Sequence, residues 1–337
     1  MLNIGIIGAG RIGKVHAESI TYHVKEAGVL AIADPFMNAE TEKWAKDLGI
    51  KKVSKDYRSI LQDPEIQAVL ICSSTNTHAD IAIEAIKAGK HVFCEKPISQ
   101  DLAKIKEVME ALKGTGLKFQ VGFNRRFDHN FEAVREAVKT GKIGDVHVVK
   151  ITSRDPDAPS LDYVKVSGGI FLDMTIHDFD MTRYLSGSDV EEVYVNGACL
   201  VNPAIAECGD IDTAIITMKL ANGALAVIDN SRKAAYGYDQ RAEVFGSKGQ
   251  VAVTNDAPST AVISTENGVT GEKPLYFFLE RYMASFSKEV SLFAQAVINN
   301  TPVPVDINDG LQPVLIAKAA AKSMKEGRPV KLSEIEF

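Results

Sequence analysis

Apolar runs alternate with amphipathic segments in the first part of the chain. Short apolar runs typical of buried strands lie at residues 4–7, 29–33, 68–72, 91–94 and 118–122. Segments with the apolar spacing of helices lie between them, at residues 14–25, 76–88 and 103–113. This alternation predicts an N-terminal doubly wound parallel sheet covered by helices, whose ligand binds at the carboxyl ends of the strands.

The pattern changes after residue 145. Strand-like segments now follow one another, at residues 147–152, 192–201, 211–220, 224–229, 241–245 and 250–253, before helical patterns at 279–299 and 310–325. Asn222-Gly223 and the tetrapeptide 246–249 are expected to join neighbouring strands as hairpins. The sequence therefore predicts two domains, 1–123 and 124–337, the second an α+β domain on a large, mostly antiparallel open sheet. The second face of such a sheet needs a cover, which favours a homo-oligomer.

Three glycines follow the first apolar run. Gly8, Gly10 and Gly13 form a G-x-G-x-x-G motif directly before the predicted helix. These glycines serve a tight turn, close approach of the backbone to a pyrophosphate, and close packing of helix on strand. The free N–H groups at the start of the helix attract phosphate, so Arg11 and Ile12 inside the motif are candidate cofactor contacts as well.

An acidic residue ends the second predicted strand. Asp34 lies 21 residues beyond Gly13, where a carboxylate accepts hydrogen bonds from the 2′-hydroxyl of an adenosine ribose. The same carboxylate repels a 2′-phosphate, which indicates NAD rather than NADP. The competing interpretation, a glycine-rich turn with an unrelated surface aspartate, does not account for the strand, turn, helix and acid occurring together. We therefore expect residues 1–123 to bind NAD.

Composition narrows the classes of partner. The formal net charge of −6 argues against nucleic acid or an anionic membrane as the main partner. No apolar run approaches the roughly 20 residues needed to cross a bilayer, and the N-terminus carries no signal-peptide pattern. The four cysteines lack C-x-x-C spacing, which fits a reduced, cytoplasmic compartment.

A lysine follows the strand at residues 91–94. The tripeptide Glu95-Lys96-Pro97 lies at the carboxyl edge of the predicted sheet, where cofactor and substrate are expected to meet. Lys96 there can hydrogen-bond a substrate hydroxyl and take part in a proton relay. The alternative, a lysine on a surface loop, stays open on position alone.

A second candidate lies in the stretch 168–180. Read as one helix, it places Asp173, His177 and Asp180 on one face, beside an apolar stripe. A carboxylate one turn from an imidazole orients the ring and favours its protonation, which suits removal of a proton from an alcohol. A purely structural pair is the main alternative. A single histidine with carboxylates, and no second histidine or cysteine nearby, is not a typical set of zinc ligands, so no metal is expected.

Two polar clusters follow predicted strands. They are Asn124-Arg125-Arg126-Phe127 and Arg154-Asp155-Pro156-Asp157. Paired arginine and aspartate side chains at a cleft suit a polyhydroxylated ligand, although each member is individually more typical of solvated loop charge. Nucleophilic serine chemistry has no support, because no G-x-S-x-G motif occurs.

Together these motifs resemble a known family. Gly8-x-Gly10-x-x-Gly13, Glu95-Lys96-Pro97 and Asp173-x-x-x-His177, in this order, are similar to the glucose–fructose oxidoreductase, inositol dehydrogenase and rhizopine catabolism family over essentially the whole chain. The stretches 169–180, 229–232 and 236–241 look like those of bacterial inositol dehydrogenases. Such enzymes oxidise a ring hydroxyl of inositol to an inosose with NAD.

The resemblance implies roles for particular residues. Lys96, Asp173 and His177 would form the catalytic triad, with His177 as general base, Asp173 as its electrostatic partner and Lys96 as hydrogen-bond donor to the reacting oxygen, while hydride passes to C4 of the nicotinamide. Further cofactor contacts would come from Ser73, Ser74, Asn76, His78, Glu95 and Lys96. Substrate contacts would come from Lys96, Arg126, Asp155, Asp173, His177 and Tyr236. It also implies a cis Lys96–Pro97 peptide bond and a homotetramer formed through the open sheet.

The identity of the substrate stays open within this family. Ser153-Arg154-Asp155-Pro156 stands where some myo-inositol enzymes carry a histidine and an asparagine that contact hydroxyls. Myo-inositol is the favoured substrate, with scyllo-inositol or another polyol or sugar as competitors. A non-catalytic NAD-binding sensor is the alternative from another class, but a sensor does not need the proton-relay residues.

Overall fold

The computed structural model describes residues 1–337 as two compact units. The first comprises residues 1–127, 283–314 and 337, and the second comprises residues 128–282 and 315–336. Compared with the expected division at residue 123, the first unit also takes in a segment from late in the chain. Helix α12 (Met283–Asn299) contributes Val290, Phe293 and Ala294 to the same apolar core as strand β1 and helix α1.

The first unit is built on a six-stranded parallel sheet. The strand order is β3-β2-β1-β4-β5-β6. The strands are β1 (Leu2–Ile7), β2 (Ala27–Ala33), β3 (Lys52–Ser54), β4 (Ala68–Ile71), β5 (His91–Glu95) and β6 (Phe119–Gly122). Strands β2 and β3 are added on one side of β1 and strands β4 to β6 on the other, so the strand order reverses between β1 and β4, which is where doubly wound sheets bind their ligand. The predicted doubly wound parallel sheet is confirmed.

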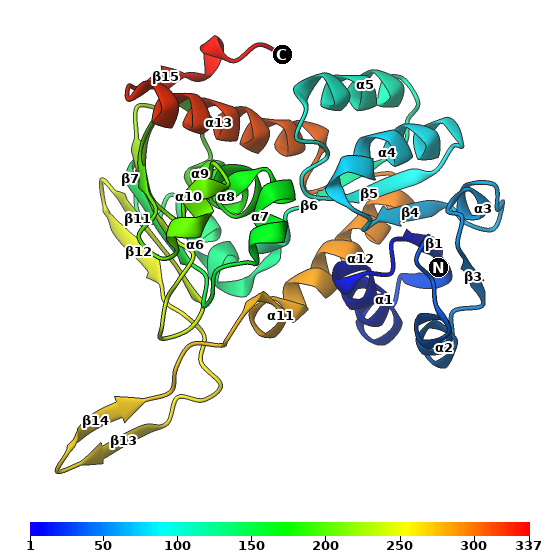
Figure 1. The fold of residues 1–337 in the computed structure, drawn as a ribbon, viewed down its shortest axis with the longest axis horizontal. Coiled ribbons are helices and arrows are strands. Elements are labelled where there is room, and N and C mark those ends of the chain that lie inside the picture. The colour runs from blue at the N-terminus through cyan, green and yellow to red at the C-terminus, as the bar shows by residue number, and fades with distance from the viewer. The chain divides into compact units, whose positions relative to one another are not determined.

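Helices cover both faces of this sheet. Helices α4 (His78–Lys87) and α5 (Leu102–Leu112) pack together on one face, and α1 (Arg11–His23) and α12 pack together on the other (Figure 1). The remaining elements of the unit are α2 (Ala39–Asp47), α3 (Arg58–Leu61) and the 3₁₀ turns η1 (Thr75–Thr77) and η2 (Asn124–Phe127). The core between α1, α12 and the sheet holds Ile4, Ile6 and Phe93, which are fully buried.

The second unit is built on a seven-stranded mixed sheet of order β12-β11-β7-β10-β9-β8-β15. The strands are β7 (Val146–Arg154), β8 (Val190–Ala198), β9 (Thr213–Leu220), β10 (Leu225–Ser231), β11 (Asp239–Gly246), β12 (Gly249–Val253) and β15 (Val330–Lys331). Only β7 and β10 pair in parallel. Both predicted hairpins are present, and Gly223 in the first turn has φ +86°. The large, mostly antiparallel sheet is therefore confirmed.

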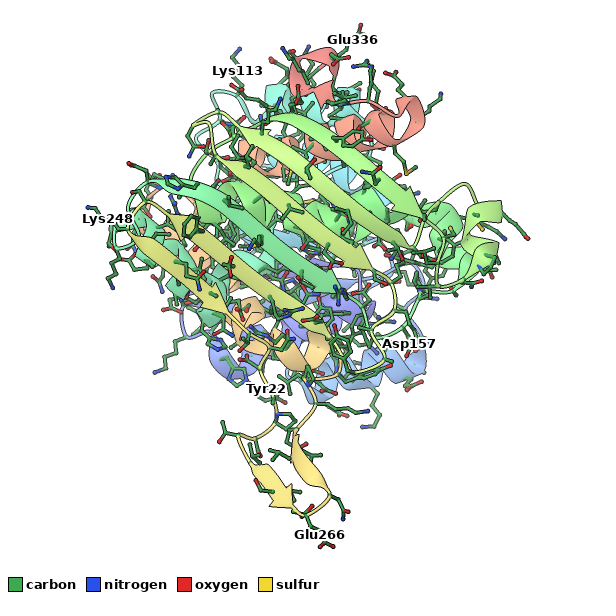
Figure 2. The ribbon with its side chains drawn as sticks, turned by 90° about the vertical axis from the view of Figure 1, so that its left-hand side faces the viewer. Tyr22, Lys113, Asp157, Lys248, Glu266 and Glu336 are labelled. Carbon is green, nitrogen blue, oxygen red and sulfur yellow. The ribbon has the colours of Figure 1, made fainter.

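One face of this second sheet is covered and the other is open. Alternate residues of β9 are buried and exposed, which is the pattern of a sheet with one solvated face. Figure 2 shows the broad face without a helix over it. On that side Ile215, Leu225 and Phe245 are 44%, 52% and 45% exposed, so the open face carries large apolar side chains.

The helices of the second unit are mostly short. They are α6 (His129–Lys139), α7 (Leu161–Ser167), α8 (Gly169–Asp173), α9 (Thr175–Ser186), α10 (Pro203–Glu207) and α11 (Phe278–Arg281). Helix α13 (Ile307–Glu326) begins in the first unit and continues in the second, where the 3₁₀ turn η3 (Leu332–Glu334) follows β15. A separate hairpin, β13 (Val262–Thr265) with β14 (Gly268–Gly271), projects from the seven-stranded sheet with Glu266 at its tip (Figures 1 and 2). None of the helices has the length and apolar character required to cross a membrane.

The structure corrects one expected helix. The stretch containing Asp173 and His177 is two helices that meet at Met174, whose backbone stays in the right-handed helical region (φ −98°, ψ −60°) while the i to i−4 hydrogen bonding is interrupted. Asp173 is the last residue of α8, and His177 lies in the first turn of α9. The backbone N–H of His177 donates to the carbonyl of Met174 at 3.3 Å, so the two side chains are not successive members of one continuous helix face.

Candidate active site

The glycine-rich turn after β1 leaves space for a ligand backbone. Gly8 adopts φ +104°, which only glycine adopts without strain. A Cβ at Gly13 would lie 1.9 Å from the carbonyl oxygen of Gly8, so a side chain there is incompatible with the turn. A Cβ at the exposed Gly10 would meet no protein atom within 4 Å. The turn is therefore closed on the side of Gly13 and open on the side of Gly10.

The N-terminus of α1 lies in this turn. Gly10 is the N-cap residue, no side chain caps the helix, and its first turn holds no acidic residue. The free N–H groups and the positive end of the helix dipole are therefore available to an anion. Arg11 is exposed and Ile12 is half-buried at the same helix end.

The carboxylate of Asp34 is fixed against the turn. Its Oδ2 accepts a hydrogen bond from the backbone N–H of Ala9 at 2.7 Å, and its Oδ1 accepts one from Phe36 at 2.8 Å. A carboxylate can accept about four hydrogen bonds, so both oxygens retain capacity for ribose hydroxyls. Asp34 thus links the end of β2 to the glycine-rich turn and points an acceptor toward it.

His78 joins two loops at the carboxyl edge of the sheet. Its Nδ1 lies 2.8 Å from the carbonyl oxygen of Pro97, and its Nε2 lies 2.9 Å from that of Ser73. Carbonyl oxygens only accept hydrogen bonds, so the buried ring serves as a clamp between the loops that follow β4 and β5. Ser74 and Asn76 are exposed in the first of these loops.

Lys96 lies in the second of the two loops. The Lys96–Pro97 peptide bond is cis, as the resemblance implies. Lys96 is half-buried, directly after β5 and next to the residue that His78 holds. In the same unit Arg126 of η2 donates from Nη2 to Asp309 Oδ1 at 3.0 Å, with 10% of its side chain exposed.

Asp173 belongs to a polar cluster in the second unit. Its Oδ1 accepts the hydroxyl proton of Tyr163 at 2.8 Å, and its Oδ2 accepts an N–H from Arg232 Nη1 at 3.0 Å. Arg232 is fully buried and also lies 3.8 Å from Asp210. Two charge-assisted contacts fix the carboxylate of Asp173 at the point where α8 gives way to α9.

His177 is carried by a helix that is anchored to the sheet. Asn230 of β10 accepts from the hydroxyl of Thr175 at 2.6 Å and donates to Asp178 at 2.9 Å. All three side chains are fully buried, so these hydrogen bonds fix the first turn of α9 against the sheet. His177 lies between Thr175 and Asp178 in that turn and is half-buried.

Tyr236 belongs to a charged network at the end of β7. Its hydroxyl donates to Asp239 at 2.5 Å and accepts from Arg154 at 3.0 Å. Arg154 also pairs with Asp229, and Arg241 pairs with Asp239. Burial, followed by the hydrogen bond to Asp239, raises the pKa of Tyr236.

The half-buried Asp155 is held through its backbone. Its N–H donates to the carbonyl of Ser231, and its own carbonyl accepts from the N–H of Ala234.

The comparisons with known proteins identify the family of the chain. Residues 2–123 match the oxidoreductase family model with an NAD-binding Rossmann fold, and residues 131–252 match the GFO/IDH/MocA C-terminal domain. The chain belongs to the GFO/IDH/MocA oxidoreductase family.

Relatives of this family match nearly the full chain. The chain is 51% identical over 332 residues to the uncharacterized oxidoreductase YrbE of Bacillus subtilis, covering 98% of this chain and 97% of the relative. It is 49% identical over 334 residues to the myo-inositol 2-dehydrogenase of Thermotoga maritima, covering 99% of each. A crystal structure of scyllo-inositol dehydrogenase from Lactobacillus casei with NAD(H) and scyllo-inositol superposes with a TM-score of 0.91, at 32% identity and 99% coverage of both chains.

The residues of this GFO/IDH/MocA chain fit NAD. The open side of the turn at Gly10, the uncapped start of α1 and the carboxylate of Asp34 supply the features that a pyrophosphate and a ribose need. The family model that matches residues 2–123 describes an NAD-binding Rossmann fold, and these residues would hold that cofactor.

Some residues of the candidate site cannot be identified from the spacing of motifs in the sequence. Tyr163 and Arg232 hydrogen-bond Asp173 although they lie 10 and 59 residues from it in the sequence. His16 lies beside Glu95 although the two are 79 residues apart in the sequence. Arg232 does occur in one of the stretches that resemble inositol dehydrogenases. Tyr163 and His16 lie in no such motif, so only the fold identifies them.

Proposed function

We propose that the protein oxidises a ring hydroxyl of an inositol to the corresponding inosose with NAD, and that myo-inositol, giving scyllo-inosose, is its substrate. The observation that carries the proposal is the 49% identity, over 99% of both chains, to a protein named as a myo-inositol 2-dehydrogenase. The retained Lys96, Asp173 and His177 support catalysis rather than sensing.

Each proposed catalytic group has a separate task. His177 removes the proton of the reacting hydroxyl, because an imidazole titrates near neutral pH. Asp173, fixed by Tyr163 and Arg232, stabilises the positive charge that His177 acquires. Lys96 donates a hydrogen bond to the reacting oxygen as its proton leaves, and NAD, when bound, accepts the hydride.

The remaining site residues are assigned to substrate and cofactor. Arg126, Asp155 and Tyr236 hydrogen-bond ring hydroxyls, since guanidinium, carboxylate and phenol groups make directional bonds to a polyol. Ser73, Ser74, Asn76 and His78 line the cofactor side, together with the glycine-rich turn.

Scyllo-inositol is the second candidate substrate. It is favoured by the Ser153-Arg154-Asp155-Pro156 stretch, which departs from some myo-inositol enzymes, and by the similarity to a scyllo-inositol dehydrogenase. The two isomers differ only in the orientation of one hydroxyl, so the groups around that position decide between them.

We further propose that the enzyme is a cytoplasmic homotetramer. The apolar side chains on the open face of the seven-stranded sheet support association through that face. The four free cysteines support a reducing compartment.

Steady-state turnover of the His177→Ala and Lys96→Ala variants tests the proposed mechanism. We expect each to lose about 10²-fold or more in kcat with NAD and inositol, the range of general acid–base catalysis. NADH binding is expected to survive in both. His23→Ala, an exposed residue at the end of α1, is the matched control and should leave kcat unchanged. Normal turnover by His177→Ala would contradict the proposal.

A further inference from the structure

Three ionisable side chains meet in the interior of the first unit. His16 comes from α1, Glu95 from the end of β5 and Glu289 from α12, and one polar atom of each lies within 4.8 Å of the other two. Their exposed fractions are 0%, 9% and 0%. None of the proposed catalytic steps uses His16 or Glu289.

His16 is held in one orientation. Its Nε2 lies 2.6 Å from Glu95 Oε1, and its ring packs edge-on against Phe93 and Phe286, with centroids 5.3 and 5.6 Å away. Its Nδ1 is buried without a hydrogen-bond partner. In the neutral tautomer whose Nε2–H donates to the carboxylate of Glu95, Nδ1 carries a lone pair that accepts a hydrogen bond from a donor.

Glu289 is the buried group without any visible partner. Neither of its carboxyl oxygens accepts a hydrogen bond, although the residue is fully buried. Its backbone is fixed, because Gln120 Nε2 donates to its carbonyl at 3.0 Å. Burial, followed by the negative charge of Glu95, raises the pKa of Glu289 well above its ordinary value. An ionised carboxylate without donors is very costly in such a place, whereas a neutral carboxylic acid is a donor.

The other titratable groups around Glu289 do not neutralise it. They are His16 of α1, Glu95 of β5, and Cys72 directly after β4, which itself neighbours Cys94 of β5. Burial raises the pKa of both thiols well above the ordinary value, so neither supplies a charge. A proton on Glu289 relieves the repulsion between the two facing carboxyl groups.

Glu95 is confined from the opposite side by β6. A Cβ added at Gly122 would lie 3.0 Å from the carboxyl carbon and from one carboxyl oxygen of Glu95. The absence of a side chain at Gly122 therefore makes room for this carboxylate. Glu95 directly precedes Lys96, so its position affects where the lysine leaves the strand.

We propose that Glu289 is a protonated carboxylic acid that donates to His16 Nδ1, and that Glu289 and His16 are positioning residues that hold the carboxylate of Glu95 at the carboxyl edge of the parallel sheet, where NAD would bind. The resulting chain carries two protons, one on Glu289 and one on His16, and leaves a single negative charge on Glu95. That charge lies on the member of the cluster nearest the edge of the sheet. The inference rests on the proposed function only in placing Glu95 beside the cofactor.

A divalent cation is the competing occupant. The same three side chains offer ligand atoms that metals accept, but a cation would require both carboxyl groups to be ionised. The protonation state of Glu289 therefore separates the two explanations.

Infrared difference spectroscopy between the wild type and Glu289→Gln tests the protonation directly. We expect the wild type at neutral pH to show the carbonyl stretch of a protonated carboxylic acid, and the variant to lack it. Absence of that band from the wild type would overturn the proposal. So would a stoichiometric metal, found by elemental analysis of the purified wild type and lost in Glu289→Gln.

NADH titration tests the positioning role. Glu289→Gln retains a neutral donor and is expected to bind NADH within about threefold of the wild type, whereas Glu289→Leu is expected to weaken binding about tenfold through loss of one buried hydrogen bond. Val290→Ala, the buried neighbour on α12, is the matched control for packing loss. Equal loss in the glutamine and leucine variants would overturn the positioning role. Neither readout uses inositol, so failure of the proposed substrate would leave these results separately interpretable.

Discussion

The buried Glu289 gives the stability of the first unit a pH dependence that one substitution removes. In the folded protein its raised pKa keeps the carboxyl protonated, whereas in the unfolded chain it ionises above its ordinary value of 4.5. Above that pH the folded state therefore binds one more proton than the unfolded state. Stability then falls as the pH rises, from 4.5 up to the folded-state pKa.

The magnitude follows from proton linkage. One proton held only in the folded state changes the free energy of unfolding by about 1.4 kcal/mol per pH unit. The wild type therefore loses this amount of stability with each pH unit between 4.5 and the folded-state pKa of Glu289, and Glu289→Gln does not. The glutamine variant should therefore be the more stable protein at neutral pH, and its advantage should grow with pH.

Urea unfolding at a series of pH values measures this difference. Trp44, the only tryptophan in the chain, lies in α2 of the first unit, so its fluorescence reports the unit that contains Glu289. Glu266→Gln, at the exposed tip of the β13–β14 hairpin, is the matched control and should follow the wild type (Figure 2). Parallel stability curves for the wild type and Glu289→Gln between pH 5 and pH 8 would refute the reasoning.

Four further substitutions probe the rest of the account. Arg232→Met should lower the free energy of unfolding by about 3–5 kcal/mol, because it leaves Asp173 without its buried partner; an unfolding curve like that of the wild type would count against this. Gly13→Ala should lower both thermal stability and NADH affinity, whereas Gly10→Ala should lower NADH affinity alone, as melting and titration would reveal. Asp34→Ser should let NADP compete with NAD, and an unchanged cofactor preference in steady-state kinetics would contradict the role of Asp34.

Local signals in the sequence predict most of the architecture. The alternation of apolar runs and helical segments predicts the parallel sheet, and Asn222-Gly223 predicts the hairpin between β9 and β10. Strand β3 escapes this reasoning, because its residues are exposed or half-buried and form no apolar run. The return of α12 to the first unit also escapes it, since contacts between α1 and α12 join segments more than 250 residues apart.

The candidate site is predicted in part, for a physical reason. Residue types that follow strands of a parallel sheet lie at a common edge, which is why Asp34 and Lys96 can be chosen from the sequence. Spacing within one segment is less reliable, and the single helix expected across Asp173 and His177 is wrong because the helical hydrogen bonding is interrupted at Met174. The partners of Asp173, and the pairing of His16 with Glu95, depend on tertiary packing that no local pattern encodes.

The most direct test of the central claim is NADH formation by the purified protein. Myo-inositol, scyllo-inositol, chiro-inositol and glucose would each be supplied with NAD and, separately, with NADP. The account predicts turnover of an inositol with NAD, fastest with myo-inositol, and little with NADP. No turnover of any inositol, from protein that still binds NADH, would contradict it.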